Sequence, residues 1–272
     1  EEGLLDEGKN NYIACLFKDT DLVAAAWTDI TTGEFLVEEF IGETAIEDAV
    51  SQMLTLSVAE IICNEDMLLA AKELKEVKHK LLPAFSCYMP WAFNVKHAEK
   101  NLLEQCNAHS LSAFGLAGKD GMISAAGALV EYLRETQKHS LSNISTVKVV
   151  QREDYMILDG NAVKNLELVR NNAEGKKYGS LLWVLDKTRT PMGGRLLRSW
   201  LEKPLLDPAE ISRRHSAVEE LVDNMIIRGE LQEALRDVTD LERVMTRIVT
   251  GTVNARDLLG LARGFRALPL VK

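Results

Sequence analysis

The stretch GLLDEGKN, residues 3–10, is the part of the sequence that comes nearest to a known chemical motif. It matches the phosphate-binding loop G-x-x-x-x-G-K-[S/T] at both glycines and at Lys9, but Asn10 stands where the motif has the hydroxyl that binds magnesium. Asp6 and Glu7 would place two carboxylates against the phosphates. The apolar run that follows is typical of a strand, whereas a phosphate loop precedes a helix. The match is therefore interpreted as accidental.

Metal-ligating residues do not occur at the spacings that metal sites use. The histidines show no H-E-x-x-H or related pattern; they are His79, His97, His109, His139 and His215. The cysteines contain no C-x-x-C pair, and we expect them to be free thiols; they are Cys15, Cys63, Cys87 and Cys106. We therefore expect this chain to bind no metal or cofactor and to catalyse no reaction.

Two acids near a turn, Asp29 and Glu34, are the remaining candidates for a metal-dependent nuclease. Each lies beside the turn at Thr32 and Gly33, so we expect both carboxylates to be solvated rather than paired around metal ions. An independent ribonuclease-H-like nuclease stays open as an alternative. Cleavage of DNA or RNA by the purified chain would support it.

Arginines recur at helical spacing in the second half of the chain: Arg195, Arg198, Arg243 and Arg247. Such residues can bind phosphate, but they more often form ion pairs with Glu and Asp on a helix surface. Gly193 and Gly194 fall inside the same predicted helix, where each costs about 1 kcal/mol relative to alanine. We expect a close approach of another backbone to compensate for that cost.

The elements that must position these residues change in kind along the chain. The first half predicts a hairpin from YIACLF and LVAAAWTDI and a third strand in GEFLVEEF, followed by a helix over ETAIEDAVSQMLTL, a strand at AEIICN and a second helix. The strand–helix–strand order implies a parallel pair within an otherwise antiparallel sheet. This order is that of ribonuclease-H-like folds.

After residue 150 the pattern is helical only. Asp159, Thr190, Asp207, Asp240 and Asn254 each precede an apolar helical pattern and are expected to cap it. Pro191 and Pro208 occupy first helical positions, where no amide donor is needed, and Glu210 completes a capping box with Asp207. The helix that follows Asp207 should bury one apolar face, formed by Ile211, Ala217, Val218, Leu221 and Val222. The polar stretch KHSLSNIS, residues 138–145, is interpreted as the connector between the halves.

Charge differs between the two halves. Residues 1–150 carry 12 Lys/Arg and 23 Asp/Glu, a balance of 12 − 23 = −11, and the remaining 20 basic and 18 acidic residues give +2. An acidic half is repelled by phosphate, so the chain is not a simple DNA-binding module. The sequence contains neither an apolar run that could span a membrane nor a signal segment. A cytoplasmic protein without membrane contact is expected.

The run LLWVLDKTRTPMGGRLLRSWLEKPLLDPAEI, residues 181–211, resembles the core domain of the MutS family of DNA mismatch-repair proteins. The family pattern is L-D-x-T-x-T-x-M-G-x-R-x-L-x-x-W-L. It is matched here by Leu185, Asp186, Thr188, Thr190, Met192, Gly193, Arg195, Leu197, Trp200 and Leu201. DLERVMTRI and ARDLLGLARGFRALP look like later core helices. Upstream, WTDITTGEF, AEIICNED, SAAGALVEYL and YMILDGNAVKNLEL are similar to the connector domain and its junction with the core.

The resemblance implies an α/β domain followed by an all-α domain. Residues 1–145 would be the ribonuclease-H-like connector, and 146–272 the N-terminal part of an incomplete helical core, or lever, domain. In the family these domains link the mismatch-reading domain to the ATPase and relay nucleotide state. The whole protein would bind mismatched duplex DNA, ATP and magnesium, form a homodimer and recruit MutL. No Phe-x-Glu mismatch-reading motif occurs here. A relative that lacks the mismatch reader and serves recombination is therefore kept as an alternative.

The segment FNVKHAEKNLLEQ, residues 93–105, predicts an amphipathic helix with Lys100 and Asn101 away from its apolar side. The resemblance implies that the corresponding outer helix of the connector faces MutL. A solvated helix face without a partner is the competing interpretation.

Overall fold

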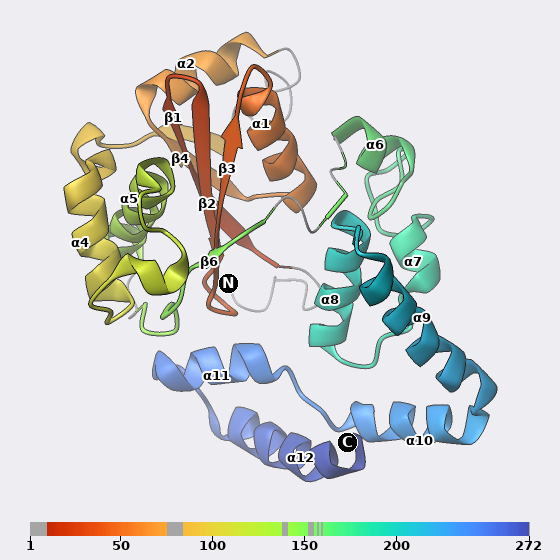
Figure 1. Ribbon diagram of the computed structural model, residues 1–272. Coiled ribbons are helices and arrows are strands. Elements are labelled where there is room, and N and C mark those ends of the chain that lie inside the picture. Colours follow the sequence, from red (N-terminus) through yellow and green to blue (C-terminus); the bar gives the residue numbers. More distant parts are fainter. Residues whose placement is uncertain are drawn as a thin grey trace. The chain divides into compact units, whose positions relative to one another are not determined.

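The computed structural model describes residues 10–74, 84–137, 141–151, 155–156, 158 and 160–271. It divides into two compact units, one of Asn11–Val150 and one that includes Gln151–Lys272 (Figure 1). The GLLDEGKN stretch, apart from Asn10, lies outside the described residues, and so does the expected cap Asp159.

Three antiparallel strands form the centre of the first unit, as predicted: β1 (Tyr12–Asp19), β2 (Leu22–Asp29) and β3 (Glu34–Ile41). The turn between β2 and β3 contains Gly33, whose φ is 76°. A Cβ added there would lie 2.6 Å from the Asn143 carbonyl oxygen, so both the backbone conformation and the available space require glycine.

Short strands extend this meander on both sides. The predicted strand β4 (Glu60–Cys63) pairs with β1 in parallel, and β5 (Phe85–Cys87) pairs with β4 in parallel. On the other edge, β6 (Lys148–Val149) pairs with β3 in parallel. The described sheet therefore has six strands in the order β5-β4-β1-β2-β3-β6. Strands β5 and β6 were not predicted, because three and two residues are too few to show a period.

Helices cover both faces of the sheet (Figure 1). One core lies under α1 (Ala45–Leu56) and α2 (Glu65–Glu73) and includes Trp27, Met53 and Met67. The other core includes Phe35, Leu102 and Leu129. It lies under η3 (Pro90–Phe93), α4 (Val95–Gln105), η4 (Leu111–Phe114) and α5 (Asp120–Thr136). Because both faces are covered, β2 is buried along nearly its whole length.

The stretch interpreted as a connector belongs in part to the first unit. Leu141 and Ile144 are 7% and 1% exposed and join the core on the α4 and α5 face. The Gln105 side-chain amide donates to the backbone oxygens of Leu141 and Ile144, at 2.8 and 2.9 Å. The first unit therefore continues past residue 145 to Val150.

The second unit is built from helices: α6 (Gly160–Asn165), α7 (Leu181–Leu185), α8 (Pro191–Glu202), α9 (Pro208–Asp223), α10 (Met225–Arg236), α11 (Leu241–Val249) and α12 (Ala255–Val271). The predicted caps Thr190, Asp207 and Asp240 each accept a hydrogen bond from a backbone N–H in the first turn. The capping-box partner Glu210 instead pairs with Arg213 at 2.7 Å. No described helix is both long and apolar enough to cross a membrane.

The prediction that α9 buries one apolar face was wrong. None of its residues is buried, and Val218 and Val222 are 60% and 62% exposed. One hydrophobic cluster of this unit consists of Leu168, Val169 and Leu182, with four further side chains packed against it: Leu158, Val163, Leu197 and Leu201. Val238, Val244 and Ala267 are also buried. The helical period correctly predicted the helix, but it did not show whether the apolar face would be covered.

Candidate functional site

The segment that follows α7 begins with a turn held by Asp186. The Asp186 carboxylate accepts from the Thr188 N–H at 3.1 Å and from the Thr188 hydroxyl at 2.6 Å. It also forms an ion pair with Lys177 at 2.5 Å. Partial burial raises the pKa of Asp186, but the Lys177 and Thr188 contacts outweigh it, and the net pKa lies below the ordinary value. The carboxylate therefore stays ionised and fixes the chain direction after α7.

Because this pKa is depressed in the folded state, Asp186 should stabilise the fold only when it is ionised. Its contribution is fully present above the pKa of an unfolded aspartate, about 3.9, and is lost as the pH falls below that value. We expect Asp186→Asn to reduce the stability of the second unit at neutral pH and to flatten its decline as the pH falls below about 4. Urea unfolding across this pH range measures the effect, and an unchanged slope would contradict it.

Thr190 begins the next helix. Its hydroxyl oxygen accepts from the Gly193 N–H at 3.0 Å, and Pro191 occupies the first helical position. A Cβ added to Gly193 would lie 3.0 Å from this hydroxyl and 3.5 Å from the Thr188 Cβ. The neighbours of Gly193 are thus threonine side chains, so the expectation of a second backbone was wrong for Gly193. For Gly194, which is buried in the same helix, it stays a prediction. Glycine leaves room for the cap.

Removing the cap should cost the second unit about 1 kcal/mol. Thr190→Ala leaves the Gly193 N–H without its side-chain acceptor, and cap losses of this kind cost about 0.5–2 kcal/mol. Thr190→Ser retains the hydroxyl and is the matched control, expected to lose far less. Chemical unfolding of both variants tests this, and equal losses would show that the methyl group rather than the hydroxyl matters.

Arg195 joins α8 to the start of α11. Its guanidinium donates to both carboxylate oxygens of Asp240 at 2.7 Å and to Glu242 at 2.5 Å. Only 6% of Arg195 is exposed. Burial lowers the pKa of Arg195, but the bonds to Asp240 and Glu242 raise it by more, so the group stays charged. Asp240 also caps α11 through the Arg243 N–H at 3.3 Å. One carboxylate therefore organises two helices.

The other arginines at helical spacing form ion pairs, as expected. Arg198 contacts Glu202 at 2.9 Å within α8, and Arg247 contacts Asp257 of α12 at 2.9 Å. Pairs that link different helices constrain their relative orientation, whereas an i,i+4 pair supports only its own helix. The ion pairs of Arg195 and Arg247 therefore connect α8 to α11 and α11 to α12.

Trp200 connects α8 to α9. The guanidinium carbon of Arg214 lies 3.7 Å from the centroid of the Trp200 ring, a cation–π contact. Trp200 remains 39% exposed, and Met192, earlier in the same helix, is half-buried. The motif residues thus supply turns, a cap and contacts between helices.

Two family models match the chain in succession. The model described as "MutS domain II" matches residues 11–145, and the model described as "MutS domain III" matches residues 161–272. The chain belongs to the MutS family.

Individual MutS relatives match nearly the whole chain. The DNA mismatch repair protein MutS of Pelotomaculum thermopropionicum is 40% identical over 100% of the chain, which corresponds to 31% of that protein. The MutS proteins of Roseiflexus castenholzii and Lachnoclostridium phytofermentans are each 37% identical, over 99% and 98% of the chain and 28% of their own lengths. The chain therefore spans about 30% of the length of the relatives it matches.

The partner surface expected on α4 of this MutS chain needs correction. Lys100 is exposed, but Asn101 is only 5% exposed and packs between α4 and α5. The Asn101 amide donates to Glu131 at 2.5 Å, and its oxygen accepts from Arg134 at 3.4 Å. Asn101 is thus an interhelical bridge. Spacing along α4 did not reveal that α5 would cover this position.

The acids considered for a nuclease accept hydrogen bonds from the turn between β2 and β3 and from residues at the start of β1. Asp29 is fully buried, so the expectation that it is solvated was wrong. Its carboxylate accepts from the Thr31 N–H and hydroxyl, at 2.9 and 2.7 Å, and from the Asn11 N–H at 3.2 Å. Glu34 accepts from the Tyr12 hydroxyl at 2.6 Å. Among the described residues, no group of three or more His, Cys, Asp or Glu is placed to hold a metal ion.

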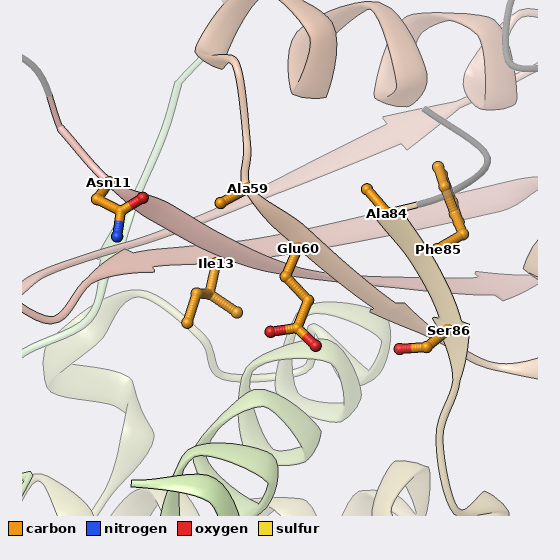
Figure 2. A pocket seen from close by; sticks show the side chains of 7 residues that line it. All are labelled: Asn11, Ile13, Ala59, Glu60, Ala84, Phe85 and Ser86. Atoms are coloured by element: carbon orange, nitrogen blue, oxygen red, sulfur yellow. The ribbon is translucent and has the colours of Figure 1, made fainter. Parts of the chain in front are cut away.

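An open cavity of about 490 Å³ lies at the N-terminal ends of β1, β4 and β5 (Figure 2). Its lining residues are Asn11, Ile13, Ala59, Glu60, Ala84, Phe85 and Ser86. The only carboxylate among them, that of Glu60, already accepts from the Tyr132 hydroxyl. None of the candidate site residues lines this cavity, and the motif at residues 185–201 lies in the other unit.

The ion-pair partners of the motif residues Asp186 and Arg195 were not predicted from the sequence. Asp240 was identified only as a helix cap, and neither Glu242 nor Lys177 was considered. The available signal was weak: a D-x-E pair lies at the start of a helix, 45 residues after the Arg195 that it binds. Helical spacing reports on one face of one helix and does not identify partners on another helix.

Proposed function

We propose that this chain is a non-catalytic linking part of a MutS-like DNA mismatch-repair protein. It would join the mismatch-reading domain to the ATPase and relay nucleotide state between them. The whole protein would bind mismatched duplex DNA, ATP and magnesium and act in the cytoplasm as a homodimer. The observation that carries this proposal is the contact of Arg195 with Asp240 and Glu242. Through this contact a residue of the family motif links α8 to the start of α11. Such a link is suited to transmitting movement rather than to catalysing a reaction.

We further propose that the first unit is a ribonuclease-H-like connector. The support is its strand order, in which an antiparallel meander is extended by β4 and β5 in parallel with β1. Fold alone does not imply a reaction. The engagement of Asp29 within its own turn also favours a structural role for this sheet.

The chain by itself should bind no ATP, and it should bind duplex DNA weakly and without preference for a mismatch. Its acidic first half repels phosphate, and the proposed function places mismatch reading in another domain. Calorimetry with ATP and fluorescence anisotropy with matched and mismatched duplexes test both points, with a whole MutS-family protein containing this chain as the positive control. Saturable ATP binding or mismatch preference by the 272-residue chain alone would contradict the proposal.

The relay role can be tested separately in the whole protein. Arg195→Lys keeps the charge but loses the forked geometry that contacts both oxygens of Asp240. We expect mismatch binding and ATP hydrolysis to persist while ATP-driven release from the mismatch slows. Arg213→Lys, at an exposed pair within α9, is the control. Normal release by the Arg195 variant would contradict the relay role.

Lys100 is what remains of the proposed MutL-facing surface. It is 72% exposed and lies 3.8 Å from Glu104, a pair that contributes little. We expect Lys100→Glu to weaken MutL recruitment by the whole protein, with a change in stability of at most about 0.5 kcal/mol. Lys148→Glu, on β6, makes the same charge change at another exposed position. A pull-down in which both variants recruit MutL normally would remove α4 from the proposal.

A further inference from the structure

Two thiols lie side by side at the edge of the sheet in the first unit. Cys63 of β4 and Cys87 of β5 are direct partners in the parallel register. Adjacent strands lie about 4.8 Å apart, and a disulfide requires Cα atoms about 4.4–6.8 Å apart. Register partners on parallel strands point to the same face, so the spacing of these two backbones suits a disulfide.

The two thiols differ in access. Cys63 is fully buried in the core under α1 and α2, and its thiol donates to the Ser86 carbonyl oxygen of β5 at 3.6 Å. Cys87 is exposed on the edge strand. The remaining cysteines, Cys15 and Cys106, are buried and half-buried. A small oxidant in solution therefore reaches Cys87 before Cys63.

The surroundings of Cys63 determine how it reacts. Burial and the neighbouring Cys87 raise its pKa to about 12, while Lys72 of α2 lowers it. Cys63 thus remains a protonated thiol at neutral pH and must lose its proton as it attacks another sulfur. Thiolate is the reactive form, so this second step should accelerate as the pH rises.

We propose that Cys63 and Cys87 form a peroxide-reactive thiol pair that closes a disulfide between β4 and β5. The Cys87 thiolate attacks hydrogen peroxide, an S–O bond forms, the O–O bond breaks, and the departing hydroxide takes up a proton to become water. The Cys63 sulfur then attacks the Cys87 sulfenic acid. An S–S bond forms, the S–O bond breaks, and the departing hydroxide takes the Cys63 proton. Two thiols and one peroxide thus give one disulfide and two waters.

Peptide mapping of the folded chain tests this pair. The reduced protein is treated with one equivalent of hydrogen peroxide, alkylated and digested. The expected product is a cross-linked peptide that joins Cys63 to Cys87 and is about 2 Da lighter than the two reduced peptides together. Its yield at a fixed time should increase from pH 7 to pH 9. A wild-type protein in which Cys87 is oxidised to the sulfinic acid, with Cys63 still reduced, would overturn the proposal.

Single substitutions assign the roles. Cys87→Ser, at an exposed position, should abolish the cross-link without disturbing the fold. Cys63→Ser should leave Cys87 as a sulfenic acid that dimedone traps. Cys106→Ser is the matched control and should leave the cross-link yield unchanged. If Cys106→Ser instead removed the cross-link, or if Cys87→Ser retained a disulfide to Cys63, the assignment of this pair would be wrong.

Discussion

Replacing Arg195 with methionine should lower the free energy of unfolding of the second unit by about 3 kcal/mol. The substitution keeps much of the side-chain volume but leaves Asp240, whose side chain is 13% exposed, without its charged partner. Removing one member of a buried ion pair is costly because the remaining charge stays desolvated. Urea unfolding, followed by hydrogen exchange in peptides from α8 and α11, measures the loss.

Two controls separate this effect from a general loss of charge. Arg213→Met breaks an exposed pair with Glu210 within α9 and should leave the unfolding midpoint unchanged. Asp240→Asn in the Arg195→Met background removes the uncompensated charge and should recover part of the stability. If Arg195→Met destabilised the unit no more than Arg213→Met does, the contact between α8 and α11 would have no structural importance.

Replacing Gly127 with alanine should destabilise the first unit by about 3 kcal/mol. A Cβ at this position would lie 2.4 Å from both the Cα and the Cβ of Ala98, and 2.6 Å from its carbonyl oxygen. These are mainly backbone atoms of α4, so relief requires α4 and α5 to move apart. That movement would disturb the Asn101–Glu131 bond between the two helices. Thermal unfolding with hydrogen exchange of α4 and α5 peptides measures the change.

Gly229→Ala is the matched control for this substitution. Gly229 also lies within a helix, α10, but a Cβ there meets no atom within 4 Å. Alanine is the better helix former, so this variant should gain about 0.5–1 kcal/mol in the second unit. A stable Gly127→Ala protein would show that α4 and α5 tolerate a wider separation than the structure has.

Local patterns in the sequence predicted most elements of both units. Alternating and continuous apolar runs located β1 to β4, and the caps Thr190, Asp207 and Asp240 located three helix starts. These signals act within a few residues, through backbone hydrogen bonds and side-chain period, so they can be read without knowledge of the fold. The family motif could likewise be recognised from the sequence, because its residues lie within one contiguous segment.

Contacts between distant residues were decided by the tertiary structure. The burial of Asn101 depends on α5, and the short strands β5 and β6 form only because longer neighbours offer them free edges. Arg195 was recognised from its position in a motif, but its partners lie 45 and 47 residues away. Sequence alone therefore determined most of the elements, the change from sheet to helices and the family motif. The tertiary structure decided which charges meet, because an ion pair between helices depends on how their faces pack, and no local period records that packing.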